Sequence, residues 1–143
     1  MTIIEEKLYK KIVKSIPIVC VDLILINQNN YLLIKRNQNP LKGEWWVPGG
    51  RILLNESLKK AVMRKLKEEI GIDLNFKPEI YGIYEDTFSD SSFGNHIYHT
   101  ISIVFKIRID NIDDISLDLT SNSWKLSNSL PKRLIEKMEV VGE

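Results

Sequence analysis

One stretch, residues 50–72 (GRILLNESLKKAVMRKLKEEIGI), constrains the fold of this chain more than any other part of the sequence. Within residues 56–70, apolar side chains recur at spacings of three and four: Leu58, Ala61, Val62, Leu66 and Ile70. This period predicts an amphipathic helix with one stripe turned toward a core. Gly71 is the residue type that commonly follows the last turn of a helix, so we expect the helix to end there.

Two adjacent carboxylates, Glu68 and Glu69, lie in the last turn of this predicted helix. At about 100° per residue, Glu69 falls inside the apolar arc and Glu68 at its edge. The C-terminal turn of a helix is partially negative, so each carboxylate there costs roughly 0.3–1 kcal/mol. A carboxylate turned toward a core also needs a cation or strong hydrogen-bond donors. The alternative is a solvated pair on a surface turn, and the spacing of the whole stretch decides between the two.

That spacing resembles the signature of the Nudix hydrolases, Gly-x5-Glu-x7-Arg-Glu-hydrophobic-x-Glu-Glu-x-Gly-hydrophobic. One position departs from it, because Lys65 stands where the family has the first glutamate after arginine. The resemblance implies an α/β (α+β) fold, in which a mixed β-sheet is sandwiched between helices and the signature forms a loop–helix–loop. The matching residues are Gly50, Glu56, Arg64, Leu66, Glu68, Glu69, Gly71 and Ile72.

The residues of the signature suit a divalent cation on chemical grounds. Mg2+ prefers oxygen ligands and commonly takes one or two carboxylates together with waters and substrate phosphates. Glu68 and Glu69 offer such a partial shell, and Gly49 can present a backbone carbonyl where the chain turns closely. The family resemblance implies Mg2+-assisted hydrolysis of a nucleoside diphosphate linked to another group, with Mn2+ as an alternative ion. It also implies that Arg64 pairs with Glu56 to brace the loop.

A narrower resemblance is to the GDP-mannose mannosyl hydrolases. In that subfamily water attacks the anomeric carbon of the sugar and releases GDP and mannose, whereas typical relatives cleave at phosphorus. The subfamily also lacks the first carboxylate of the signature, so Lys65 departs less from it. The resemblance extends over residues 15–22, 35–40, 43–51 and 81–84, the polar segment after them and the strand that follows His99.

This resemblance implies roles for four residues at the diphosphate and the sugar. Arg36, Arg51 and Arg64 would bind or neutralise the diphosphate, whose charge grows as it leaves. Asp22 would lie near the sugar, where an anion favours an oxocarbenium-like state. The alternatives are that Asp22 caps or pairs within its strand, that Arg36 and Arg51 are solvated surface charges, and that Arg64 only braces the loop.

The resemblance also implies a metal site and a base. The metal ligands would be the Gly49 carbonyl, Glu69 and Glu68, with Asp118 replacing a glutamine of the subfamily. The histidine that follows this glutamine in the subfamily has no counterpart, because Leu119 follows Asp118. Only His96 and His99 occur in the chain, and both are candidate bases, of which His99 is assigned to the site; the alternative is that they are structural or exposed histidines.

Lys65 changes the expected charge of the metal site. It precedes Glu69 by four residues, about one helical turn, so its ammonium can neutralise the carboxylate that relatives share with another metal ion. We therefore expect fewer bound Mg2+ ions than in a site with three carboxylates.

Composition narrows the class of protein. The 143 residues suggest one domain, 1–143, with 43% hydrophobic and 27% charged residues. A net charge of +1 argues against a nucleic-acid or membrane surface, so the expected partner is a small nucleotide sugar. The sequence contains no secretory signal or long apolar run, which predicts a cytoplasmic protein. Cys20 is expected to be a buried thiol, and a homodimer through the N-terminal helix is possible.

The remaining patterns predict a mixed order of helices and strands. Helices are expected at residues 3–14 and 130–138, the second capped by Ser127 or Ser129. A polar loop is expected at residues 85–95. Strands are expected at residues 16–26, 31–35, 45–47, 80–84 and 98–109 and around Trp124.

Three functions are compatible with these residues. The first is hydrolysis of GDP-mannose, or a similar nucleotide sugar, to GDP and mannose. The second is a Nudix pyrophosphatase that cleaves a P–O bond in a nucleotide sugar or a nucleoside triphosphate. The third is a catalytically weak nucleotide-binding or regulatory module, which Lys65 and the absent histidine would favour.

Overall fold

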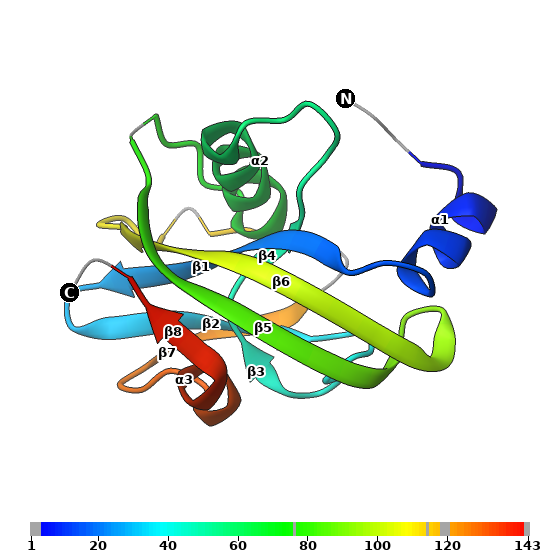
Figure 1. The fold of residues 1–143 in the computed structure, drawn as a ribbon. Helices are drawn as coiled ribbons and strands as arrows, with labels where there is room; N and C mark the ends of the chain where they lie inside the picture. Colours follow the sequence, from blue (N-terminus) through cyan, green and yellow to red (C-terminus); the bar gives the residue numbers. More distant parts are fainter. Residues whose placement is uncertain (1–3, 76, 114, 118–120, 142–143) are drawn as a thin grey trace.

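The computed structural model describes residues 4–75, 77–113, 115–117 and 121–141. Over these residues the chain forms a mixed sheet with helices on both faces, which confirms the expected α+β class (Figure 1). The helices are α1 (Glu6–Val13), α2 (Leu58–Ile70) and α3 (Lys132–Lys137). The strands are β1 (Ile18–Asn27), β2 (Asn30–Arg36), β3 (Trp45–Trp46), β4 (Gly49–Arg51), β5 (Glu79–Ser91), β6 (Gly94–Arg108), β7 (Ser121–Ser127) and β8 (Met138–Val140).

The sheet is organised around β1, which has different partners on its two sides. The strand order is β3-β2-β1-β6-β5-β8, with β4 paired to β1 and β7 paired to β2. On one side β1 runs parallel to β6, from Ile18 opposite Thr100 to Ile26 opposite Arg108. On its other side, the end of β1 pairs with β2 next to the turn that joins them. Residues 20–22, nearer the start of β1, pair with β4. This division places the backbone of Gly49 directly opposite Asp22.

Two apolar cores lie on the two faces of the sheet, as Figure 1 indicates by the positions of α2 and α3. On the first face, the predicted stripe of α2 is buried against alternate residues of β1. On the second face, Trp46 and Tyr84 pack with Leu134 of α3. The buried residues of the first core include Val21, Leu23, Leu25, Ala61, Val62, Leu66 and Ile70.

Helix α2 begins at Leu58, two residues later than the start expected at residue 56. Ser57 is its N-cap, and the Ser57 hydroxyl accepts a hydrogen bond from the Lys60 N–H at 3.2 Å. The helix ends at Gly71, as expected, where the Gly71 N–H donates to the carbonyl of Lys67 at 3.0 Å. Glu56 lies before the cap, so its carboxylate is available to the preceding loop.

The expected polar loop at residues 85–95 is wrong, because β5 and β6 continue through it as one long hairpin. The two strands pair from Glu79 opposite Lys106 to Ser91 opposite Gly94. Residues 85–91 are polar on both faces except for Phe88, so the apolar alternation that marks a strand is missing here. Helix α1 packs at the tip of this hairpin, where the rings of Tyr9 and Phe93 are 5.7 Å apart.

Two further features of the local structure differ from what the sequence predicted. Strands β4 and β8 were not predicted, since each is only three residues long and depends on pairing with β1 or β5. The last helix begins after Pro131 and has no side-chain cap. Ser127 instead donates to the carbonyl of Ser129 at 2.9 Å. None of the helices in the described part of the chain is long and apolar enough to cross a membrane.

A buried ionic network joins α3 to β5. The side chain of Asp86 is fully buried, and Arg133 donates to both of its oxygens at 2.5 and 2.8 Å. Lys137 approaches the same carboxylate at 3.4 Å, and the Tyr84 hydroxyl donates to it. Burial opposes ionisation of Asp86, but the hydrogen bonds from Arg133, Tyr84 and the Thr87 N–H outweigh it. The pKa of Asp86 is therefore lowered.

Removing one partner of this network should destabilise the protein. Arg133→Met leaves a buried carboxylate with fewer donors, and we expect the free energy of unfolding at pH 7 to fall by about 1–3 kcal/mol. A lowered pKa contributes stability above the unfolded value of about 3.9 and loses it as pH falls below. The difference between variant and parent should therefore shrink in acid.

Urea unfolding between pH 3 and pH 7 measures this effect. The matched control is Lys132→Met, which removes a cation whose side chain is 89% exposed and next to Arg133 in sequence. Equal stabilities of the two variants at pH 7 would contradict the assigned role of the network.

Candidate functional site

A cavity of about 230 Å3 lies where β1, β4 and β6 meet. Asp22, Tyr84 and Ser102 line it from three neighbouring strands. Because side chains alternate along a strand, these residues are on the face opposite the one that packs on α2. Helix α2 nevertheless contributes Lys65 and Glu69 to the lining, past the short strand β4.

Asp22 is the carboxylate within the sheet that faces this cavity. The residue is 9% exposed, and burial raises the pKa of Asp22 to about 6. Arg36 lowers the pKa and Glu69 raises it, both through space. Ser102 is also buried, and its hydroxyl has no hydrogen bond of normal geometry within the described part of the chain. It nevertheless lies near enough to the Asp22 carboxylate to favour the ionised form.

Gly49 joins the sheet to the carboxylates of α2. Its N–H donates to Glu69 Oε1 at 3.2 Å. A Cβ at this position would overlap both the Asp22 carboxylate and the carbonyl of Val21, so the backbone can approach β1 only as glycine. Glu69 is 5% exposed, in agreement with its position in the apolar arc.

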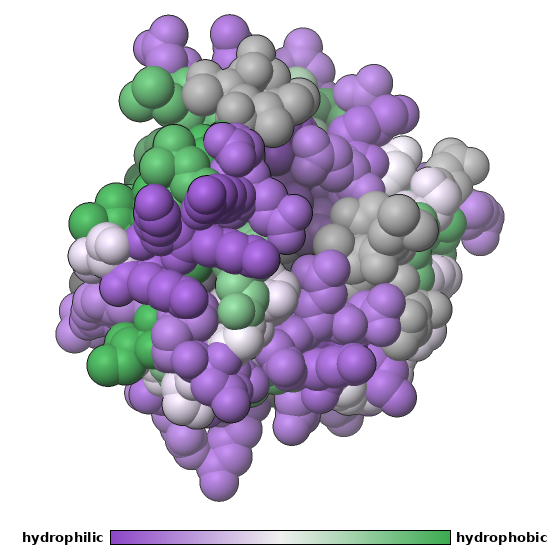
Figure 2. Space-filling model, turned by 90° about the vertical axis from the view of Figure 1, so that its right-hand side faces the viewer, coloured by the Kyte–Doolittle hydropathy of each residue, from purple (hydrophilic) through white to green (hydrophobic). Residues whose placement is uncertain are grey.

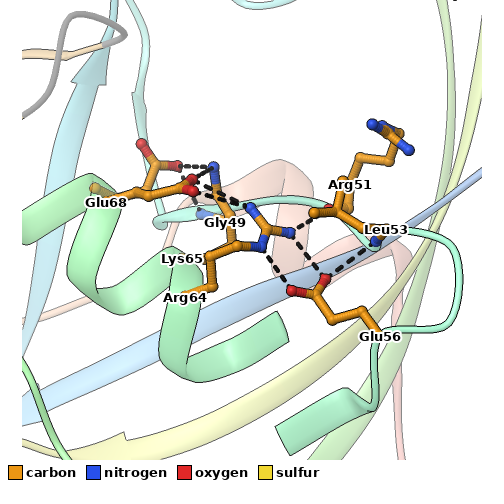
Figure 3. A network of polar contacts seen from close by, with 8 residues as sticks. Gly49, Arg51, Leu53, Glu56, Arg64, Lys65 and Glu68 are labelled. Carbon is orange, nitrogen blue, oxygen red and sulfur yellow. Dashed lines mark hydrogen bonds and ion pairs between the residues drawn. The ribbon is translucent and has the colours of Figure 1, made fainter. Parts of the chain in front are cut away.

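Arg64 holds the loop before α2 in place (Figure 3). Its Nε and Nη2 atoms donate to the two oxygens of Glu56 at 2.7 and 3.0 Å. Nη2 also donates to the carbonyl of Arg51 at 2.9 Å, and the Leu53 N–H donates to Glu56 at 3.1 Å. The hydrogen bond and charge of Arg64 lower the pKa of Glu56 despite its burial. This pairing is the brace that the family resemblance implied.

Glu68 lies between two cations at the end of the same network (Figure 3). Arg64 Nη1 donates to both of its oxygens, at 3.3 and 3.1 Å. Lys65 Nζ is 3.3 Å from Glu68 Oε2 and 3.8 Å from Glu69 Oε1. The contact with Glu69 agrees with the expectation from the helical spacing.

Arg36 and Arg51 line the cavity, whereas Arg64 and Glu68 are not among the residues that line it. Arg36 is oriented by the chain itself, since its Nε donates to the carbonyl of Pro40 at 2.7 Å. The guanidinium of Arg51 lies over the ring of Tyr9, 5.0 Å from its centroid. Cys20 also lines the cavity, and burial raises the pKa of its thiol to about 12, so the thiol stays protonated.

The structure does not bring His99 to the cavity. Tyr98 and Thr100 line it, so the side chain of His99 between them lies on the other face of β6. There His99 Nε2 contacts Glu85 at 2.7 Å. Asp118, the remaining candidate ligand, lies outside the described residues.

Sequence reasoning missed Ser102, Tyr84 and Tyr98 as cavity residues. The available signal was a period of two, because Tyr98, Thr100 and Ser102 place hydroxyl groups at alternate positions, on one face of β6. Polar side chains on a buried strand face indicate a lined cavity or a buried network.

The acidic groups suit a divalent ion that is held partly by substrate. The described part of the chain contains no set of three or more acidic, histidine or cysteine side chains arranged to hold a metal ion. Mg2+ commonly takes only one or two carboxylates and completes its shell with waters and phosphates. Glu69, with Glu68 and the Gly49 backbone beside it, matches that partial shell.

Comparison with known proteins shows which family this sequence and fold belong to. The family model described as NUDIX domain matches residues 17–122. The low-salt glycan biosynthesis protein Agl8 of Haloferax volcanii is 31% identical over 126 residues, which span 87% of this chain and 80% of that protein. An ADP-ribose pyrophosphatase of Methanocaldococcus jannaschii is 40% identical over 89 residues, which span 62% of this chain and 49% of that protein.

Among solved structures, a MutT NUDIX hydrolase from Burkholderia pseudomallei superposes with a TM-score of 0.70. The two share 20% sequence identity, and the match spans 85% of this chain and 95% of that one. This likeness shows that the fold is shared.

The raised pKa of Asp22 predicts a gain in stability when its charge is removed. The folded state binds this proton more tightly than the unfolded chain, so stability falls as pH rises from about 4 to about 6 and then levels. Asp22→Asn removes the cost of burying the charge, and we expect it to stabilise the protein by about 1–3 kcal/mol at pH 7.5.

Thermal unfolding with EDTA present, at pH 4.0 and pH 7.5, checks this prediction. The gain should nearly vanish at pH 4.0, where Asp22 is already protonated in the folded protein. Asp73→Asn, at an exposed position, serves as the control. A variant less stable than the parent at pH 7.5 would mean that the Asp22 carboxylate is satisfied by its surroundings.

Proposed function

Because this chain belongs to the Nudix hydrolase family, we propose that it is a Mg2+-dependent hydrolase of a nucleoside diphosphate sugar. The proposed reaction is that of the GDP-mannose mannosyl hydrolases, in which water converts GDP-mannose to GDP and mannose. The observation that carries this proposal is the position of Asp22. It is a buried carboxylate on the cavity floor, opposite the Gly49 backbone and near cationic side chains.

Asp22 suits attack at a sugar carbon better than attack at phosphorus. Cleavage of the bond between the anomeric carbon and oxygen builds positive charge on the sugar, and a nearby carboxylate stabilises that charge. Near a phosphorus centre, by contrast, an anion would repel the negatively charged diphosphate. With a pKa of about 6, Asp22 is mainly ionised at neutral pH, as this role needs.

Positively charged side chains also line the cavity. Arg36 and Arg51 can meet the two phosphates, and fixed cations stabilise a leaving diphosphate without reorganising. Glu69 and the Gly49 carbonyl would hold the Mg2+ ion, with Glu68 and Asp118 as further candidate oxygen ligands. When bound, the ion would neutralise charge on the diphosphate.

The size of the cavity also fits part of such a substrate. A volume of about 230 Å3 is below the roughly 300–1,000 Å3 of pockets that enclose a drug-sized ligand. We propose that the diphosphate and the sugar occupy the cavity and that the nucleobase lies toward the aromatic rim at Phe88 and Tyr9. The name of the Haloferax volcanii relative, a glycan biosynthesis protein, is consistent with a sugar nucleotide.

A second candidate is P–O cleavage in a molecule such as ADP-ribose. Two observations favour it: Glu68 is retained beside Glu69, and a relative that is 40% identical carries the name ADP-ribose pyrophosphatase. This chain spans about half the length of that relative, so its substrate is only a candidate here.

The assembly and location of the protein remain predictions. We propose one domain over residues 1–143, a cytoplasmic location and a homodimer that uses α1. Leu8 on α1 and Ile16 after it are 53% and 57% exposed and are candidate contacts. On the face shown in Figure 2, hydrophilic residues predominate and apolar residues form small separate groups.

Hydrolysis in 18O-labelled water separates the two reactions. With GDP-mannose and Mg2+, we expect GDP and mannose, with the label in the mannose. GMP and mannose 1-phosphate would instead support P–O cleavage, as would AMP and ribose 5-phosphate from ADP-ribose. No turnover across a panel of nucleotide sugars and nucleoside triphosphates would overturn both candidates and leave the weak binding module.

Substitution of Glu69 tests the metal assignment. Glu69→Gln keeps the size of the side chain but removes its charge, and we expect activity at saturating Mg2+ to fall about 100-fold or more. The control is Glu79→Gln at the exposed start of β5, which should retain activity. Full activity of the Glu69 variant would exclude it as the main ligand.

A further inference from the structure

Lys65 is the feature of the site that the proposed reaction does not explain. It stands between the two carboxylates of α2 and lines the same cavity as Asp22. We propose that its ammonium is a built-in cation that takes the place of a second metal ion, so that the substrate-free site binds a single divalent ion. The proposal rests on the proposed function only in assuming that Glu69 faces a metal.

The contacts of Lys65 are those of a bridging cation. Its Nζ atom is 3.3 Å from Glu68 and 3.8 Å from Glu69, and its side chain is only 14% exposed. The three residues are spaced i, i+3 and i+4, so their side chains meet on one face of α2. A surface lysine that only follows the helix would be far more exposed.

The end of the Lys65 side chain also lies against the backbone of β4. A Cβ on Gly50 would lie 2.6 Å from Cε and 2.9 Å from Nζ of Lys65, so the side chain lies directly against the glycine. The absence of a side chain at Gly50 leaves room for the lysine.

The distribution of charge shows where a divalent ion can bind. Arg64 pairs with Glu56 and Glu68, and Lys65 contacts Glu68 and Glu69. Glu68 thus has two cationic neighbours, and a divalent ion at that carboxylate would be repelled by both. Glu69, together with the Gly49 backbone, remains the favoured position for an ion.

Replacing Lys65 should change the number of ions that bind. Lys65→Glu removes the ammonium and puts a third carboxylate on the same helical face, so the three acidic groups then need cations of their own. Lys65→Met keeps most of the apolar stem and removes only the charge. Lys67→Glu, two residues further on an exposed face, makes the same charge change away from the cavity and is the matched control.

Titration of substrate-free protein with Mn2+ alone tests the proposal without reference to activity. Free Mn2+ is counted by electron paramagnetic resonance and heat by calorimetry, in about 150 mM salt so that distant charges are screened. We expect one ion per chain for the parent and for Lys67→Glu, and two for Lys65→Glu. Two ions on the parent, one ion on a folded Lys65→Glu protein, or no ion on either protein would overturn the proposal.

A second measurement covers the case in which Lys65→Glu does not fold. Lys65→Met should bind its first Mn2+ about tenfold more tightly than the parent, because a neighbouring positive charge has been removed. Affinity unchanged within twofold would overturn the proposal. A protein that changes from one ion to two but hydrolyses no nucleotide sugar would refute the proposed function and leave the role of Lys65 intact.

Discussion

The guanidinium of Arg64 is the interaction on which the geometry of this site depends. It binds Glu56 in the loop, the carbonyl of Arg51 in β4 and Glu68 in its own helix. One side chain therefore fixes a loop, a strand and a helix relative to one another. All three residues of β4 pair with β1, which sets Gly49 opposite Asp22, and the hydrogen bond from Arg64 to the Arg51 carbonyl ties the same strand to α2. The cavity follows from that placement.

The acidic residues of the cavity stand in contrast to those that stabilise the fold. Asp86 is fully buried yet surrounded by donors, and the pKa of its carboxyl is lowered. Asp22 is also buried, but burial dominates and the pKa is raised. The donors around Asp86 stabilise its charge, whereas the surroundings of Asp22 disfavour the charged form. Such a difference is typical of a group whose charge serves a ligand and not the folded state.

The sequence predicted those parts of the molecule that depend on local periodicity. The stripe of α2 and the burial of Glu69 follow from spacing along one helix, whereas the Arg64–Glu56 pair was implied by the family resemblance. The hairpin at residues 85–95 could not be predicted, because its strands are held by cross-strand pairing and carry polar residues on both faces. His99 illustrates the same limit: a shift of one residue along a strand moves a side chain to the opposite face. Only the long-range pairing decides which face holds the cavity.

Helix α1 lies outside the sheet and both apolar cores, yet it supplies part of the cavity. Through Tyr9 it contacts Arg51 on one side and Phe93 at the hairpin tip on the other. The segment that contributes least to the folded core therefore shapes the entrance to the most polar part of the molecule. Substitutions in α1 can therefore change the lining of the cavity while the carboxylates of α2 and the apolar cores stay unchanged.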